Sequence, residues 1–477
     1  MLVAVVSLGA VLPSAAAGAA TRASSVKWTP CADTVGAPRD TACATLEVPL
    51  DYADPDGREI TLMLYAAGNG AAPRGLVVNP GGPGESGAGM PKLITAGLPR
   101  GVSDQYMVVS FDPRGVGASS PVDCGDTDSV LPPPAPAYRP SNEQSEQQRL
   151  DAAKRVADQC AEESRDLLPH ITTQNAAKDM DRIRAALGQE KLDYLGYSYG
   201  SMLGATYASL FPATTGRMIL DSVVDPTVPT YQTQFQQDPA LQQRSEAFFA
   251  WVAGKDARYH LGTTEKAVSD TWNAVRDQLA KQPAAGKVGV AELDDLLSSS
   301  IYSDTGWDSL AKPVGEYHGG RPDALVAAHT SHGGNVNGAQ LAYNCVDRSW
   351  PKDWATWHRD TEQAARRSPL FAWLNSWYSA PCAFWKVPTA EPVPIGGAKV
   401  PPILLLQAKN DAATPVIGAQ RMHTALPGSK LVVADSGNHG QYLQDNNPCV
   451  DGYGTAYLES GELPDAGKTC AAPPPRP

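Results

Sequence analysis

The sequence predicts an α/β fold in which a mostly parallel central sheet is flanked by helices and interrupted by a helical insertion. Short Val/Ile/Leu runs end in Gly, Asp or Asn, and segments with a helical period separate them. Runs without apolar–polar alternation are typical of strands buried on both faces, as in a parallel sheet covered by helices. This strand rhythm stops between about Pro229 and Lys399, where the period becomes helical. The helical stretch is therefore expected to be an insertion.

Seven segments of the sequence are predicted to form strands. They are EITLMLYAA from Glu59, GLVVNP from Gly75, YMVVSFD from Tyr106, LDYLGY from Leu192, RMILDSVV from Arg217, PILLLQA from Pro402 and KLVVADS from Lys430. Residues 175–187 place Met180, Ile183 and Leu187 on one face and stop at Gly188, which predicts a crossover helix. Nine of the ten tryptophans lie within the insertion. We expect most of them to pack in a small core of the insertion and two or three to line a substrate cleft.

The composition narrows the class of protein. The chain has 477 residues, 42% hydrophobic and 19% charged side chains, which is typical of a globular protein and not of a fibrous or disordered one. The length fits either about three domains or one large α/β unit with an insertion. The formal net charge is −12, from 39 basic and 51 acidic residues without a basic block. Such a surface repels phosphate, which argues against nucleic acid and anionic membranes as partners.

The N-terminal segment predicts export. An apolar run ends at Pro13, and small residues with Ala-x-Ala cleavage options follow it, so residues 1–24 are typical of a secretory signal. A buried N-terminal helix is the alternative. No other stretch reaches the ~18–20 apolar residues that cross a bilayer. We expect a secreted protein without membrane insertion.

The eight cysteines favour disulfides, because no Cys-x-x-Cys or Cys/His metal-ligand spacing is present. Some free buried thiols are the alternative. Many connectivities are possible, and the simplest is sequential: Cys31–Cys43, Cys124–Cys160, Cys345–Cys382 and Cys449–Cys470. Together with the strand pattern, this suggests a signal-like segment at 1–24, a first core part at 25–228, a helical cap at 229–396, a second core part at 397–470 and a tail at 471–477.

One motif points to a nucleophile. GYSYGS, residues 196–201, joins a predicted strand to a predicted helix, and it is the only Gly-x-Ser-x-Gly in the chain. A sharp strand–turn–helix needs small residues two before and two after the serine, and it presents the hydroxyl above the sheet at a helix N-terminus. Ser198 is therefore the expected nucleophile.

A serine nucleophile needs a histidine base and an acid that orients it, and in this type of fold they follow in the order Ser, acid, His. Asp411 and His439 each come just after one of the last two predicted strands, where their side chains would meet. His423 also follows Asp411 in the sequence, but it falls in a helical pattern and is interpreted as a surface residue of a helix. Asp435 is a competing acid, but four residues before His439 it still belongs to the strand pattern.

Two backbone N–H groups are needed to stabilise the oxyanion of acyl transfer. One is expected from Tyr199, the residue after the nucleophile, and the other from Gly82 in the Gly-rich turn of VVNPGGPGESG. A phosphate-binding loop is the rival interpretation of this turn, but the Lys and Ser/Thr of a P-loop are missing. Asp112 and Arg114 in the next loop are interpreted as structural.

Further segments carry a family resemblance over nearly the whole mature chain. They are NPGGPGESG, FDPRGVG, GYSYGS with YASLFP, LDSVVDP, NCVD around Cys345, QAKNDAATP, GNHG, and the end pattern Cys449, YLESGELP, Cys470. The sequence resembles the secreted bacterial tripeptidyl aminopeptidases and their relatives, an α/β-hydrolase family akin to proline iminopeptidases. The resemblance implies an α/β-hydrolase fold with a cap after LDSVVDP, the triad Ser198, Asp411 and His439, and cleavage near a free peptide N-terminus.

The substrate amine is expected to be held by an acidic side chain of the cap. Three extended residues span ~3.3 Å each, so an anchor for a tripeptide lies about 10 Å from Ser198 Oγ. Glu246, Asp294 and Asp295 are the candidates on helical cap segments. Glu85, which departs from the family pattern of a small residue, suits release of a single residue. Simple solvation at the surface is the alternative for each of these residues.

The sequence as a whole predicts a secreted serine exopeptidase that acts on peptides with a free N-terminus and needs no cofactor or metal. An esterase or other small-molecule hydrolase on the same scaffold is the first alternative, because the triad does not distinguish amides from esters. A non-catalytic binding protein is the second, and the three intact triad positions argue against it. The sequence makes no prediction of an oligomeric state.

Overall fold

The computed structural model describes residues 26–33, 36–228, 230–330, 338–465 and 467–473. The expected signal segment, 1–24, and the end of the expected tail, 474–477, lie outside the described residues.

The core is built on one sheet with the strand order β1-β2-β3-β5-β4-β6-β7-β8-β9-β10. Pairing is parallel from β5 through β10 and antiparallel among β1, β2, β3 and β5. The strands are β1 (Thr29–Pro30), β2 (Ala42–Pro49), β3 (Glu59–Gly68), β4 (Arg74–Asn79), β5 (Tyr106–Phe111), β6 (Leu192–Tyr197), β7 (Thr215–Asp221), β8 (Leu404–Ala408), β9 (Lys430–Ala434) and β10 (Lys468–Cys470). The chain therefore has the predicted α/β-hydrolase fold.

All seven predicted strands are present, and three strands were not predicted: β1, β2 and β10. β2 escapes a search for apolar runs because Thr45 and Glu47 interrupt it. These residues are tolerated because β2 lies toward the antiparallel end of the sheet, where one face can remain polar.

Helices cover both faces of the sheet. One face packs against α1 (Met90–Gly97), α2 (Arg100–Ser103) and α17 (Pro448–Ser460). The other packs against α4 (Thr173–Ala186), α5 (Tyr199–Leu210) and α16 (Val416–Ala425), and α4 is the predicted crossover helix. Among the described helices, none is both long and apolar enough to cross a membrane.

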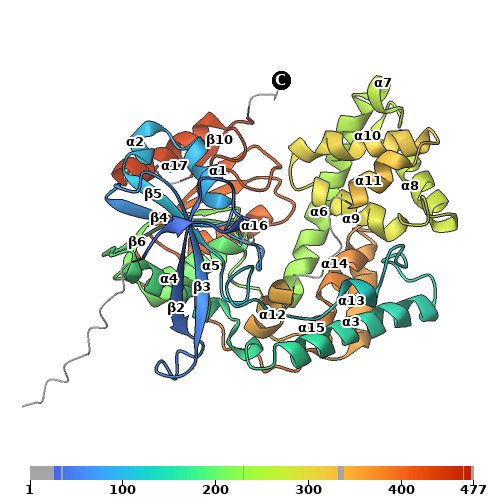
Figure 1. Cartoon of the computed structure of the whole chain (residues 1–477). Helices are drawn as coiled ribbons and strands as arrows, with labels where there is room; N and C mark the ends of the chain where they lie inside the picture. Colours follow the sequence, from blue (N-terminus) through green and yellow to red (C-terminus); the bar gives the residue numbers. More distant parts are fainter. Residues whose placement is uncertain (1–25, 34–35, 229, 331–337, 466, 474–477) are drawn as a thin grey trace, which may run out of the picture.

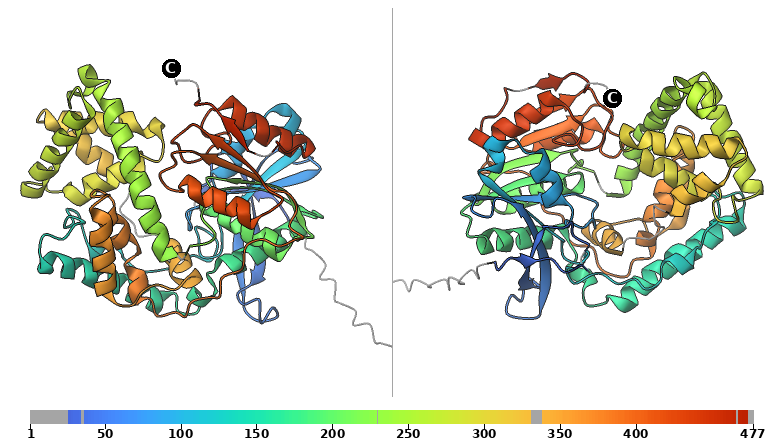
Figure 2. Two further views of the ribbon diagram at one scale, coloured as in Figure 1. Left: turned by 180° about the vertical axis from the view of Figure 1, so that it is seen from behind. Right: turned by 45° about the horizontal axis from the view of Figure 1, so that its top comes forward.

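Between β7 and β8 the described chain is helical, with no strand apart from an isolated bridge. Its helices are α6 (Thr230–Ala253), α7 (Asp256–Tyr259), α8 (Glu265–Lys281), α9 (Val290–Ser300), α10 (Trp307–His318), α11 (Asp323–Thr330), α12 (Gly338–Asp347), α13 (Trp354–Ala365), α14 (Ala372–Ser379) and α15 (Pro381–Phe384). They form a cap that stands beside the sheet, with α6 on the side that faces the core (Figures 1 and 2).

The helix α3 (Glu143–Glu163) was not predicted, and it lies against the cap although it precedes the cap in sequence. It runs beneath the cap next to α15 (Figure 1), and its Ala153 shares a cluster with Trp373 and Trp377 of α14. The residue range 25–228 is thus not all core in space, because α3 supplies part of the support of the cap.

Most tryptophans of the cap lie in its core, as expected. Seven of the nine are buried, at 7% exposure or less, and Trp251 and Trp354 are half-buried. Trp354 stacks on Trp357 and Trp377, and Trp251 packs edge-on against Trp307. The tryptophans serve as packing groups inside the cap, because buried indoles contribute large apolar contact areas.

The structure joins the eight cysteines in the four sequential pairs, Cys31–Cys43, Cys124–Cys160, Cys345–Cys382 and Cys449–Cys470, and leaves no cysteine free. We therefore expect the native protein to resist alkylation until a reductant is added, and then to take up eight alkyl groups. Mass spectrometry before and after reduction measures this. Two or more thiols that react without reductant would contradict the pairing.

Candidate active site

The turn between β6 and α5 presents Ser198 in an unusual backbone conformation. Ser198 has φ 54° and ψ −124°, in the left-handed half of the map that non-glycine residues avoid. Its N–H donates to Asp221 O at the end of the neighbouring strand β7, at 2.9 Å. A Cβ on Gly196 would come within 2.4 Å of Gly200 O, so the strand and helix approach too closely for a side chain there. The motif thus holds a half-buried serine above the sheet, as the sequence predicts.

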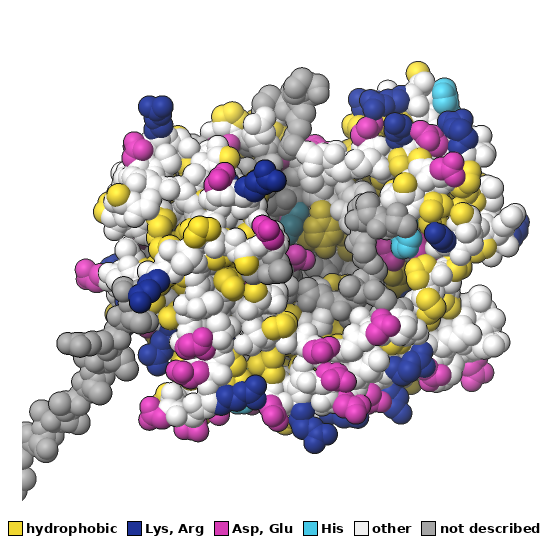
Figure 3. Space-filling model, in the orientation of Figure 1, with side chains coloured by type: hydrophobic (Ala, Val, Ile, Leu, Met, Phe, Trp, Pro, Cys, Tyr) yellow, Lys and Arg dark blue, Asp and Glu magenta, His cyan; other side chains and the backbone are white. Residues whose placement is uncertain are grey.

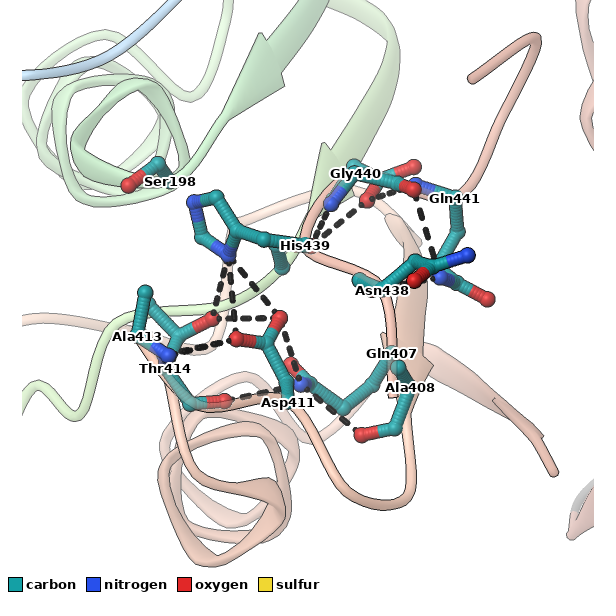
Figure 4. A network of polar contacts seen from close by, with 12 residues as sticks. Ser198, Gln407, Ala408, Asp411, Ala413, Thr414, Asn438, His439, Gly440 and Gln441 are labelled. Atoms are coloured by element: carbon teal, nitrogen blue, oxygen red, sulfur yellow. Dashed lines mark hydrogen bonds and ion pairs between the residues drawn. The ribbon is translucent and has the colours of Figure 1, made fainter. Parts of the chain in front are cut away.

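His439 and Asp411 meet at the carboxyl ends of β9 and β8. His439 Nδ1 lies 3.0 Å from both carboxylate oxygens of Asp411. The Asp411 side chain is buried, and it accepts hydrogen bonds from the N–H groups of Ala413 and Thr414 at 2.9 Å and from Thr414 Oγ1 at 3.0 Å. The other ring nitrogen of His439 points toward Ser198 (Figure 4). The three predicted side chains therefore lie together in the order that proton transfer from serine requires.

Asp435, the competing acid, lies away from this group. It is exposed, its carboxylate faces Lys409 Nζ at 3.9 Å, and its N–H donates to Cys470 O in the edge strand β10. The structure brings Asp411, and not Asp435, to the imidazole.

Asp221 and Tyr302 hold the histidine loop in place, and the sequence analysis assigned neither a role. The carboxylate of Asp221 accepts from the N–H groups of Gln441 and Tyr442 at 2.9 and 2.7 Å. Burial raises the pKa of Asp221 to about 7, although these hydrogen bonds lower it. Tyr302 O, in the cap, accepts from His439 N–H at 2.8 Å, and the tyrosine ring packs edge-on against the imidazole. In the sequence, this role of Asp221 is indicated only by its position at the end of the strand β7, which pairs with β6.

The electrostatics of His439 lead to a prediction for the pH profile. Burial lowers the pKa of His439, but the charge and hydrogen bond of Asp411 and the charge of Asp221 outweigh it, and the pKa is raised above its usual 6.5. Only neutral imidazole accepts the serine proton, so activity is lost as the pH falls through this pKa. We expect kcat/KM for a small ester to rise with pH along a limb centred above 6.5, and Asp411→Asn to move that limb to lower pH. A limb below 6.5 in the native protein would contradict this.

The Gly-rich turn after β4 lies against the nucleophile. A Cβ on Gly81, where φ is +109°, would come within 2.8 Å of Ser198 Cβ and 3.2 Å of Tyr199 N. The N–H of Gly81 donates to Asn79 Oδ1 at 3.0 Å, so it is occupied. Gly82 follows it at the exposed surface. The turn is therefore in the right place to supply an oxyanion donor, and Gly82 and Tyr199 remain the proposed pair.

Asp112 holds this Gly-rich turn in place by hydrogen bonds. One carboxylate oxygen accepts from Ser86 Oγ at 2.6 Å and from Gly87 N at 2.9 Å, and the other accepts from Tyr65 Oη at 2.8 Å. The carboxylate thus ties the Gly-rich turn to the loop after β5, which agrees with the structural interpretation of Asp112.

Known proteins are similar to this chain over most of its length. Residues 368–470, which include Asp411 and His439, match a family model described as TAP-like protein. A tripeptidyl aminopeptidase from Streptomyces lividans is 38% identical over 475 residues, which cover 96% of this chain and 88% of that protein. The chain belongs to the tripeptidyl aminopeptidase family. It is accordingly a serine hydrolase of α/β-hydrolase fold.

Other relatives of this protein have different names. Serine protease Hip1 from Mycobacterium tuberculosis (strain ATCC 25618 / H37Rv) is 32% identical, over 93% of this chain and 91% of that protein. Carboxylesterase B from the same strain is 29% identical, over 91% and 87%. Among solved structures, a proline iminopeptidase-related protein from Thermus thermophilus is 15% identical, with a TM-score of 0.35 and coverage of 87% of this chain and 97% of that chain.

The protein has a cleft between its core and its cap. Figure 3 shows a hollow between the two parts, with histidine and apolar side chains inside it. Tyr302 is 38% exposed and Tyr378 is 53% exposed. Burial raises the pKa of Tyr378, and the charges of Tyr302 and Glu85 raise it further. Tyr302 packs edge-on against His439, so this exposed tyrosine lies beside the proposed catalytic groups.

Two of the acids that were expected to bind the substrate amine face other cap residues. Asp294 is 2% exposed and pairs with Arg276 at 2.8 Å. Asp295 accepts from Tyr138 Oη at 2.5 Å, a residue of the segment that leads into α3. Both carboxylates thus already have partners within the cap.

The remaining two expected acids are exposed. Glu246 lies on α6 and accepts a hydrogen bond from Gln242 Nε2 at 3.4 Å. Glu85 follows the Gly-rich turn, and its charge is one of the causes that raise the pKa of Tyr378. The structure therefore brings none of the four acids into contact with Ser198, Asp411 or His439.

Proposed function

We propose that this protein is an exopeptidase that releases short peptides, most readily tripeptides, from free N-termini through an acyl-enzyme on Ser198. The observation that carries the proposal is the placement of Ser198, His439 and Asp411 at the carboxyl ends of β6, β9 and β8, with the 3.0 Å contact between His439 Nδ1 and Asp411. The peptidase names of the relatives that share most of this chain's length support the choice of peptides as substrates.

The reaction follows from the positions of these side chains. His439 takes the proton from Ser198 Oγ as the oxygen attacks the substrate carbonyl, and Asp411 stabilises the imidazolium. The N–H groups of Gly82 and Tyr199 hold the oxyanion. His439 then gives the proton to the leaving amine, the C–N bond breaks, and a water deprotonated by His439 hydrolyses the acyl-enzyme.

The contact between cap and core supports action at a chain end. Leu241 of α6, Phe371 beside α14 and Ala412, the residue after Asp411, share one buried cluster. The cap therefore packs onto the loop that carries the acid, and we infer that it closes the cleft on that side. A closed cleft admits the end of a peptide more readily than its middle.

The four disulfides support a site of action outside the cytoplasm. They persist in oxidising compartments, and they fit the secretion that the N-terminal segment predicts. The proposed partner is accordingly a peptide with a free N-terminus in the extracellular space.

An esterase is the second candidate function, because Carboxylesterase B is among the relatives and the same three side chains can cleave esters. Incubation with a mixture of peptides that carry free or acetylated N-termini, followed by mass analysis of the products, distinguishes the functions. Release of tripeptides only from free N-termini is the expected result. Cleavage of acetylated peptides at equal rates would refute the exopeptidase, and turnover of esters alone would establish the esterase.

A further inference from the structure

The helix α6 runs alongside both loops that carry the proposed catalytic groups. Gln237 Nε2 donates to Ala413 O at 2.6 Å, two residues after Asp411. Two turns further along, Arg244 donates to Asn438 Oδ1 at 2.6 Å, next to His439. This face of α6 therefore lies against the two loops that carry the proposed catalytic groups.

Asp238, adjacent to Gln237, has an incomplete set of partners. It is 1% exposed, and its Oδ1 accepts from Asn375 Nδ2 of α14 at 2.8 Å. Its Oδ2 has no hydrogen-bond partner among the described residues. One turn earlier, Gln234 is 5% exposed, and both of its amide atoms also lack partners among the described residues. Buried polar atoms are normally satisfied, so this pair needs an explanation.

Asp238 lacks the cation or the several hydrogen-bond donors that other buried acids among the described residues have. Asp294 also has an unpartnered oxygen, Oδ1, but it has an arginine beside it. Asp294 pairs with Arg276, Asp179 pairs with Arg114, and Asp221 accepts from two backbone N–H groups. Burial raises the pKa of Asp238 to about 7, and only the amide of Asn375 lowers it. A buried carboxylate without a cation is costly, and a cationic ligand would supply the missing charge.

The helix α14 leads from Asp238 toward the surface. Asn375, which donates to Asp238, is half-buried, and Tyr378, one turn further along α14, is 53% exposed. Asp238 follows Gln237, whose side chain contacts Ala413, two residues after Asp411. Asp238 therefore belongs to the part of α6 that lies on the Asp411 side of the site.

We propose that Asp238 binds the α-ammonium group of the peptide substrate and that Gln234 hydrogen-bonds a peptide group next to it. This inference rests on the proposed exopeptidase function, and it names the cap acid that the sequence analysis placed at Glu246, Asp294 or Asp295. Asp238 is a substrate-binding residue in this proposal and takes no part in the proton transfers at Ser198.

The test compares Asp238→Asn with Glu246→Gln, a matched control on the same helix. The substrates are Ala-Ala-Ala-p-nitroanilide, its N-acetyl derivative and p-nitrophenyl acetate. Asp238→Asn should raise KM for the free tripeptide about 10- to 100-fold, as loss of a hydrogen bond to a charged group does. Cleavage of the acetyl peptide, which lacks the ammonium group, should stay at its low native rate, turnover of the ester should be unaffected, and Glu246→Gln should behave like the native protein.

The stability of the variant gives an independent readout. Asparagine keeps the acceptor for Asn375 Nδ2 and removes the uncompensated charge, so Tm should stay equal or rise, whereas a purely structural aspartate would give a lower Tm. If Asp238→Asn does not fold, Asp238→Ser carries the same kinetic expectation.

The outcomes separate the two proposals. If the native protein prefers free N-termini and the Asp238 variants keep that preference, Asp238 is not the anchor and the exopeptidase stands. If the native protein cleaves free and acetylated peptides equally, the exopeptidase itself is refuted. A lower Tm together with equal losses on all three substrates would assign Asp238 a structural role and overturn the inference.

Discussion

Ser198→Ala, His439→Ala and Asp411→Asn are each expected to lower kcat by ~10³–10⁶-fold, with double variants little worse than single ones. The reason is that the three side chains act as one unit: the hydroxyl is inert without the base, and the base is misoriented without its acid. The His439–Asp411 contact of 3.0 Å and the strained backbone of Ser198 are the observations behind this expectation. Steady-state kinetics measure the effect, and circular dichroism shows whether each variant is folded.

The matched control for the acid is Asp435→Asn. Asp435 is exposed and faces only Lys409, so its amide should keep near-native kcat. Near-normal activity of Asp411→Asn, combined with a large loss for Asp435→Asn, would reverse the assignment of the acid.

The parts of this site that follow from the sequence are those with strong local patterns. The strand β6, the Gly-x-Ser-x-Gly turn and α5 are contiguous, so their geometry is fixed locally, and Ser198 could be placed. Asp411 and His439 come after uninterrupted apolar strands, and the carboxyl ends of neighbouring parallel strands meet at one edge of the sheet. Both were therefore found from their position after a strand.

The features that the sequence did not indicate depend on long-range packing. The support of His439 by Tyr302 joins residues far apart in the chain, and no local pattern announces it. The helix α3 is mostly polar and has a weak apolar stripe, so its place beneath the cap depends on Trp373 and Trp377 far along the chain. Asp238 looks like any helical acid in the sequence, because only the folded structure shows that its Oδ2 is buried and unpartnered among the described residues.

The second large effect is expected from Arg114, in the loop after β5. Its guanidinium is fully buried, and it donates to Asp179 at 2.6 and 2.7 Å and to the carbonyl oxygen of Leu50 at 2.9 Å. Arg114→Met leaves the Asp179 carboxylate buried without its cation, a change that destabilises proteins by about 3–5 kcal/mol. The free energy of unfolding in urea should fall by this amount. An exposed arginine, Arg58, pairs with Asp166 at 3.8 Å, and Arg58→Met should change the free energy little.

The double variant Arg114→Met/Asp179→Leu separates the value of the ion pair from the cost of breaking it. Replacing both partners removes the uncompensated charge, so the double variant should regain much of the stability that Arg114→Met loses. The recovery should be incomplete, because Leu50 O and Pro49 O, which accept from Arg114 at 2.9 and 3.2 Å, lose a buried donor. A double variant no more stable than Arg114→Met would show that these carbonyl contacts, and not the charge of Asp179, dominate. The hydrogen bond from Tyr343 Oη of α12 to the backbone carbonyl of Arg114, at 3.1 Å, is available in every variant, so differences between the variants report on the side-chain contacts alone.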